Sequence, residues 1–326
     1  MSEQLSILKK IPNWVYYLVT IGLIIALPIL LGGSAYWRSI LITISLNIML
    51  AMSLNLILGY TGQLHLGHSA FYGVGAYATT LLIKKAGFSF WFAVATSSLL
   101  AGIIGVLLAF FATRLKGHYL AIASMAFAII LHQILLNWGS MTSGPLGIYG
   151  IAPPPPIALF GLEIKFNNQV NLFYLISFVA LISYIVLNNI LKSPIGDTLR
   201  AIREDEVSAA SLGINAKLWK VFSFGVGAMI AGLAGSFYPS FVGTLVPDAF
   251  AVIESFSYLA MVVVGGMGTM IGPIIGAVVL TLLPELLRSI GDARLLVYGL
   301  SLTLVVLFMP GGILQAIQLI KTKLIK

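Results

Sequence analysis

The chain alternates between long apolar runs and short polar connections. A helix needs about 20 mostly apolar residues to cross the hydrocarbon core of a bilayer, and ten runs approach that length. They are Val15–Gly33, Ile40–Leu58, Gly67–Ile83, Phe90–Thr113, Tyr119–Trp138, Leu172–Leu191, Val221–Val242, Phe250–Gly265, Ile271–Leu287 and Leu295–Met309. The pattern predicts an all-α integral membrane protein of about ten transmembrane helices, with residues 1–326 forming a single transmembrane domain.

Composition supports this class and excludes others. Of the 326 residues, 59% are hydrophobic and 9% are charged, whereas soluble domains carry about 25% charged residues. Disorder is excluded because it requires few apolar residues and many charges. The chain has no cysteine, so it cannot form a disulfide, a thiolate metal site or a cysteine nucleophile. No metal site is expected at His65 and His68, because no third ligand lies nearby in the sequence.

Lysine and arginine predict the orientation of the spans. With the N-terminus in the cytoplasm and ten spans, inside segments hold 12 of the 18 basic residues and outside segments hold 6. This excess predicts that both termini are cytoplasmic and that residues 139–169 form an extracytoplasmic loop. In that loop, Pro153–Pro156 form either a rigid surface segment or a docking surface for an outside partner. Because the net charge of +8 arises between apolar runs, we expect contact with membrane lipid and none with nucleic acid.

The inside connection contains a predicted cytoplasmic helix within residues 193–213. Asp197 is a suitable N-cap and Gly213 a suitable residue after the C-terminus, and Arg200 is spaced to pair with Glu204. The segment carries two arginines against four acids, a net charge of −2. A helix on anionic lipid needs a basic polar face, so a protein partner fits this acidic segment better. A solvated linking helix is the alternative.

A second unusual segment, Ser53–Tyr77, places glycines and polar side chains at membrane depth. Broken helices survive there only within protein or beside a water-filled cavity, and they often line a transport path. The candidate path residues are Asn55, Gly59, Gly62, Gln63, Gly67 and His68. Structural alternatives are an inter-helix hydrogen bond for Asn55, a satisfied buried ring for His68, and helix packing for Gly73 and Gly75. Gly265–Ala277 is a similar glycine-rich stretch.

No catalytic signature is present, so we expect no enzyme activity. The sequence contains neither a P-loop nor a Gly-x-Ser-x-Gly nucleophile elbow. Acidic residues within the spans, which a proton relay would need, are scarce. If the chain moves a solute uphill, the energy is expected to come from a partner.

Three blocks carry a resemblance to a known family. They are Ser53–Tyr77, Arg203–Asn215 and Met261–Gly268, with further echoes at Gly117–Ile122, Gly144–Gly150 and Leu283–Arg288. On these blocks the chain resembles the LivM family, permease subunits of ABC importers for branched-chain amino acids (leucine, isoleucine and valine). The likeness covers nearly the whole chain. It departs at His65, where such permeases more usually have a serine.

The resemblance implies a type II ABC importer-like fold in a bacterial or archaeal cytoplasmic (inner) membrane. It implies four partners: a LivH-like second permease, two ABC ATPase subunits and an extracytoplasmic substrate-binding protein. ATP and Mg²⁺ would bind to the ATPases, and this chain would bind no cofactor. The family's ATPase-coupling motif is similar to Glu206–Gly213. Carried over to this sequence, the coupling residues are Arg203, Glu204, Asp205, Glu206, Ala209, Ala210 and Gly213.

Two alternatives stay open at this stage. The first is the urea and short-amide branch of the same family, whose permeases resemble this chain. The second is a self-sufficient secondary transporter or channel, which would need no ATPase partner. The sequence does not distinguish which amino acid or amide is preferred, or whether the second permease is another copy of this chain.

Overall fold

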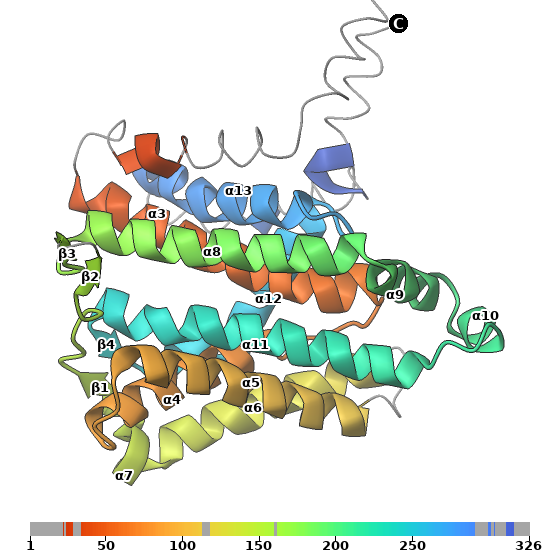
Figure 1. The fold of residues 1–326 in the computed structure, drawn as a ribbon, viewed down its shortest axis with the longest axis horizontal. Coiled ribbons are helices and arrows are strands. Elements are labelled where there is room, and N and C mark those ends of the chain that lie inside the picture. The colour runs from red at the N-terminus through yellow and green to blue at the C-terminus, as the bar shows by residue number, and fades with distance from the viewer. Residues whose placement is uncertain are drawn as a thin grey trace, which may run out of the picture.

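The computed structural model describes residues 22, 24–28, 34–112, 118–159, 162–290, 299–300, 303 and 311–315. Within them, long helices lie side by side in a bundle (Figure 1). The predicted spans Val15–Gly33 and Leu295–Met309 fall largely outside the described residues, as do both termini. Each of the other eight predicted spans coincides with a helix.

The bundle helices form where the apolar runs predict them. They are α3 (Ala35–Asn55) with its π-helical continuation η1 (Leu56–Tyr60), α4 (His68–Lys84), α5 (Phe90–Ala112), α6 (His118–Asn137), α8 (Gln169–Lys192), α11 (Ala216–Val242), α12 (Val252–Gly265) and α13 (Gly272–Leu286). Among the described residues, five helices are long and apolar enough to cross a membrane: α3 with η1, α5, α6, α8 and α11. The multi-pass helical class is thereby confirmed, whereas the count of ten spans and their orientation stay predictions.

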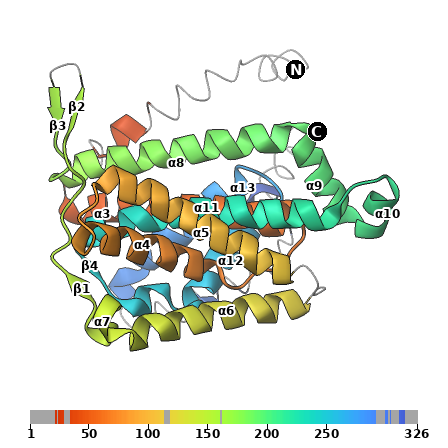
Figure 2. The same cartoon turned by 60° about the horizontal axis from the view of Figure 1, so that its bottom comes forward.

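Smaller elements lie at the two ends of the bundle. One end carries α9 (Pro194–Glu204) and α10 (Glu206–Ser211) and is called the α10 end here (Figure 2). The opposite end carries α7 (Gly139–Thr142), η2 (Gly144–Leu146), β1 (Ile148–Tyr149), β2 (Ile157–Leu159), β3 (Leu162–Ile164), β4 (Thr244–Leu245) and η3 (Pro247–Phe250). The short helix η4 (Leu287–Ile290) follows α13 directly.

Two short antiparallel sheets organise the residues predicted as an extracytoplasmic loop. β1 pairs with β4, with Ile148 opposite Leu245, and β2 pairs with β3, with Ala158 opposite Glu163. The sheet between β1 and β4 ties this loop to the connection after α11. The segment is therefore more ordered than a simple loop, and the all-α bundle carries two small sheets at one end.

Burial shows that α3 is the central helix. Its most apolar window is 83% buried, and α3 packs against α8, α11, α12 and α13. The corresponding window of α6 is only 28% buried. Large apolar side chains such as Leu100, Phe110 and Ile130 are exposed on the outer helices α5 and α6. An apolar outer surface of this kind suits contact with lipid rather than water.

Glycines bring α4, α5 and α11 close together. A Cβ on Gly75 of α4 would overlap the Gly232 carbonyl of α11, and a Cβ on Gly105 of α5 would overlap Ala228 of α11. Small residues at such positions let helix backbones approach closely inside a membrane. The packing role weighed for Gly75 is therefore the role that the structure shows.

Candidate coupling and transport site

The segment at the α10 end contains two helices, so the prediction of one helix capped by Asp197 is wrong. The Ser193 hydroxyl accepts a hydrogen bond from the Ile195 amide at 3.3 Å and caps α9. Asp197 instead lies in the first turn of α9 and pairs with Arg200 at 2.6 Å, so Arg200 does not form the expected pair with Glu204. Gly213 has φ +83°, as expected for a residue that ends a helix.

Asp205 divides the two helices because it caps the second one. Its carboxylate accepts hydrogen bonds from the Ser208 hydroxyl at 2.8 Å and from the Val207 and Ser208 amides at 2.8 and 3.2 Å. The Ser208 hydroxyl, followed by these amides, lowers the pKa of the Asp205 carboxyl. Residues 194–213, which comprise α9, α10 and the turn after α10, are called the α9–α10 hairpin below.

Most acids of the α9–α10 hairpin are used within the chain. Glu206 pairs with Lys220 of α11 at 2.6 Å, Asp197 pairs with Arg200, and Asp205 is the cap. Among the described residues, no hydrogen bond or ion pair involves the Glu204 carboxylate. Three of the four acids therefore already have partners within the chain, although their side chains stay exposed.

The hairpin also exposes two large apolar side chains among its polar ones. Val207 and Leu212 are 79% and 80% exposed, although Ala209 is buried and Ala210 is exposed. Neither Val207 nor Leu212 is among the coupling residues predicted from the sequence. The sequence feature that could have identified them is the presence of two large apolar residues in a polar segment outside the predicted spans.

Arg203 joins the hairpin to the end of α3. Its guanidinium donates a hydrogen bond to the Gly59 carbonyl in η1. A Cβ on Gly62 would lie 3.2 Å from the Arg203 side chain, and a Cβ on Gly268 would overlap the guanidinium. A hollow at this point is lined by Tyr60, Arg200, Arg203, Glu204 and Gly268. Arg203 therefore touches both glycine-rich stretches.

Asn55 holds the two glycine-rich stretches together. Its side-chain nitrogen donates to the Thr269 carbonyl at 2.8 Å, and its side-chain oxygen accepts from the Gly268 amide at 2.9 Å. These contacts connect the end of α3 to the break between α12 and α13, more than 200 residues away in the sequence. The geometry favours the structural alternative for Asn55, an inter-helix hydrogen bond.

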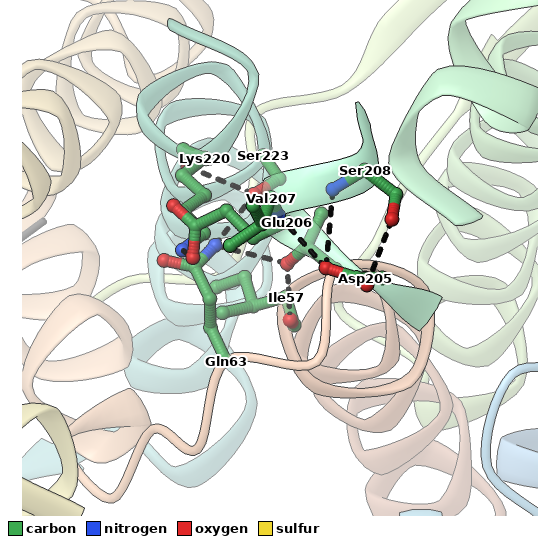
Figure 3. Close-up of polar contacts among 9 residues, drawn as sticks. Ile57, Gln63, Asp205, Glu206, Val207, Ser208, Lys220 and Ser223 are labelled. Carbon is green, nitrogen blue, oxygen red and sulfur yellow. Dashed lines mark hydrogen bonds and ion pairs between the residues drawn. The ribbon is translucent and has the colours of Figure 1, made fainter. Parts of the chain in front are cut away.

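A second series of polar contacts connects α10 to the break after η1 (Figure 3). The Gln63 amide donates to the Thr61 hydroxyl at 2.9 Å and to the Ser223 hydroxyl at 3.4 Å. Ser223 in turn donates to the Lys220 carbonyl at 2.8 Å, and the Lys220 ammonium is the group that pairs with Glu206. Gln63 is thus placed at the α10 end, beside the first turns of α11.

The break between η1 and α4 carries the chain back into the bundle. Residues 61–67 have no helical structure, and the Leu66 amide donates to the Ser124 hydroxyl of α6 at 2.9 Å. A Cβ on Gly67 would overlap the Ser124 carbonyl. His68 begins α4 fully buried, with Nε2 2.7 Å from the Ser53 hydroxyl. This contact favours the structural alternative for Nε2, whereas Nδ1 of His68 has no hydrogen-bond partner among the described residues.

No described part of the chain gathers three or more His, Cys, Asp or Glu residues that could hold a metal ion. The predicted site residues fall into two groups. Arg203, Gly59, Gly62 and Asn55 meet at the α10 end, with Gln63 nearby, whereas Gly67 and His68 lie deeper in the bundle.

The fold and this arrangement define a multi-pass helical membrane protein with two interrupted helices inside its bundle. Residues 36–309 match the family described as the permease component of branched-chain amino acid transport systems. The chain belongs to this family, and its resemblance to LivM is confirmed.

Similar curated proteins include both kinds of permease. The chain is 33% identical over 265 residues to the high-affinity branched-chain amino acid transport system permease protein LivM of Escherichia coli (strain K12), covering 76% of this chain and 62% of that protein. It is 26% identical over 196 residues to a probable LivM of Methanocaldococcus jannaschii, covering 60% and 55%. It is 26% identical over 267 residues to LivH of Salmonella typhimurium, covering 76% and 84%. No solved structure matches.

The chain spans about 62% of the length of the LivM proteins from Escherichia coli and Salmonella typhimurium. The assignment of the chain to the permease class and to a membrane therefore rests on its membership of the family, whose model matches residues 36–309.

Proposed function

We propose that the chain is the permease subunit of an ABC importer that takes up leucine, isoleucine and valine across a bacterial or archaeal cytoplasmic membrane. In this proposal the α10 end faces the cytoplasm, and residues 139–169 face outward. The partners are a LivH-like permease, two ABC ATPases and an extracytoplasmic binding protein. ATP and Mg²⁺ bind to the ATPases, and this chain contributes no catalytic residue.

The contact of one short hairpin with both helix breaks carries the proposal. Arg203 bonds to Gly59 beside Gly62 and Gly268, and Glu206 reaches the segment of Gln63 through Lys220 and Ser223. A force on the hairpin would therefore act on both interrupted helices at once. Movement of packed elements between two arrangements is how such a force opens a path.

The exposed face of the hairpin gives the ATPase contact its chemistry. Val207 and Leu212 project into solvent, and truly exposed large apolar residues at a polar end of a membrane protein suit burial against a partner. On the same hairpin, the Glu204 carboxylate has no hydrogen bond or ion pair among the described residues, and it lines the hollow with Arg203. In this proposal Arg203, Asp205, Glu206, Ala209, Ala210 and Gly213 hold the hairpin in shape and transmit its movement.

Purification and transport test the proposal together. A tagged chain is isolated from its native membranes in mild detergent, and copurifying proteins are identified by mass spectrometry. We expect two Walker-type ATPases and a second permease, and leucine uptake when the complex is reconstituted with its binding protein. Recovery of the chain alone, under conditions that preserve other ABC complexes, would favour a secondary transporter or channel. Uptake of urea without leucine would favour the amide branch.

A further inference from the structure

His65 is a fully buried side chain in the break after η1 and is not among the residues of the proposed coupling contacts. Its relative exposure is 0%. Neither ring nitrogen has a hydrogen-bond partner among the described residues. Leaving a buried polar atom unpaired costs free energy, so proteins rarely keep one without a purpose. An imidazole with two such atoms points to a second arrangement of the chain in which both are satisfied.

Aromatic rings enclose this imidazole. Phe71 of α4 stacks on it with ring centroids 5.4 Å apart, and Phe224 of α11 meets it edge to face at 5.0 Å. His68 lies at 5.7 Å, but its Nε2 already contacts Ser53. The enclosure therefore joins the break to α4 and α11, two of the elements that meet the α10 end of the bundle.

We propose that His65 contacts the transported amino acid when the break opens. A neutral imidazole offers one N–H donor and one acceptor nitrogen. A zwitterionic amino acid offers the complement, a carboxylate that accepts and an ammonium that donates. Phe71 and Phe224 provide apolar walls that suit an aliphatic side chain, and they reseal around the ring when the path closes. Water has the same donor and acceptor chemistry, so the experiment separates solute from water. The inference rests on the proposed function.

The chain has no cysteine, so a cysteine introduced at position 65 is the single thiol of this chain and can be labelled specifically. In the assembled complex, H65C is treated with N-ethylmaleimide without nucleotide, with ATP, and after trapping with ADP and vanadate. S89C, in the exposed connection between α4 and α5 and away from the proposed ATPase contact, is the control that should always react. S236C, fully buried in α11, is the control that should not react. We expect H65C to react in one nucleotide state only, and leucine to slow that reaction whereas urea does not.

Two further variants separate contact from packing. H65F keeps an aromatic ring against Phe71 and Phe224 but removes both nitrogens, and H65N keeps a donor and an acceptor in a smaller side chain. We expect H65F to lower the rate of leucine transport about tenfold or more while the complex still assembles and hydrolyses ATP, and H65N to retain more of that rate.

Several results would overturn the inference. The first is that H65C stays unreactive in every nucleotide state. The second is that leucine does not slow the labelling of H65C, which would indicate that water alone enters. The third is that H65F transports leucine at the wild-type rate. Failure of the proposed function is visible separately, because the wild-type complex would then not import leucine at all.

Discussion

Replacing Arg203 with methionine should uncouple ATP hydrolysis from transport. Methionine keeps most of the side-chain length but removes the donor to the Gly59 carbonyl. That carbonyl lies at the end of a helix, where carbonyls have no partner within the helix. The substitution leaves Asn55 bonded to the second break, so the bundle should still assemble.

The expected size of the effect follows from the exposure of Arg203. A hydrogen bond from a charged donor contributes about 1.5–3 kcal/mol. Arg203 is exposed although Gly59 is buried, so water competes for the guanidinium and the lower end applies. Because about 1.4 kcal/mol corresponds to a tenfold change in an equilibrium, we expect the ratio of leucine transported to ATP hydrolysed to fall about tenfold.

The assay is that ratio, measured in proteoliposomes holding the whole complex. K217M is the matched control, because Lys217 is an exposed cation at the same end of the bundle, 4.5 Å from the Phe110 ring. Among the described residues, Lys217 forms no hydrogen bond or ion pair with either break. We expect K217M to keep the wild-type ratio and R203K to fall between the two. A wild-type ratio in R203M would refute the reasoning. An equal fall of the ratio in K217M would show that loss of a positive charge, and not loss of the Gly59 contact, causes the effect.

Three further predictions concern separate features. V207D and L212D should each lower the recovery of ATPase in the pull-down about tenfold, because each variant loses apolar burial of about 1.5–3 kcal/mol. S211D on the same hairpin should leave the recovery unchanged. Unchanged recovery with V207D and L212D would show that these residues are not in the interface. G75L should lower the temperature of thermal unfolding, since overpacking costs about 1–3 kcal/mol, and G139L, which meets open space, should not; equal melting would contradict the close packing. The pKa of the Asp205 carboxyl is lowered from its ordinary value of 3.8, so the carboxylate cap is complete above that value and weakens as pH falls through the lowered pKa. Hydrogen exchange, corrected for intrinsic rates, should therefore show constant protection of the Val207 amide from about pH 5 to pH 8. Lost protection within that range would contradict the assignment.

The sequence predicts the eight described bundle helices because length and apolarity suffice to mark a span. It misplaces the start of the first hairpin helix because Ser193 and Asp197 are both suitable caps. Ser193 is the cap, and Pro194 after it suits the first helical position. The second helix begins separately at Asp205, whose carboxylate accepts from the Ser208 hydroxyl and two amides. The contacts of Asn55 and Arg203 lie beyond such reasoning, because their partners become neighbours only when distant segments pack.

The glycines of the two breaks change the meaning of the predicted transport path. Gly59 and Gly268 lie where Asn55 and Arg203 approach the backbone, so side chains there would overlap their neighbours. These glycines permit contact between breaks, a requirement distinct from lining a path. Side chains that meet a solute must then lie deeper, where the chain turns back into the bundle toward Gly67 and His68. His68 is bonded to Ser53 through Nε2, and its Nδ1 has no hydrogen-bond partner among the described residues. Neither nitrogen of His65 has such a partner, so His65 has more unmet hydrogen-bonding capacity than His68.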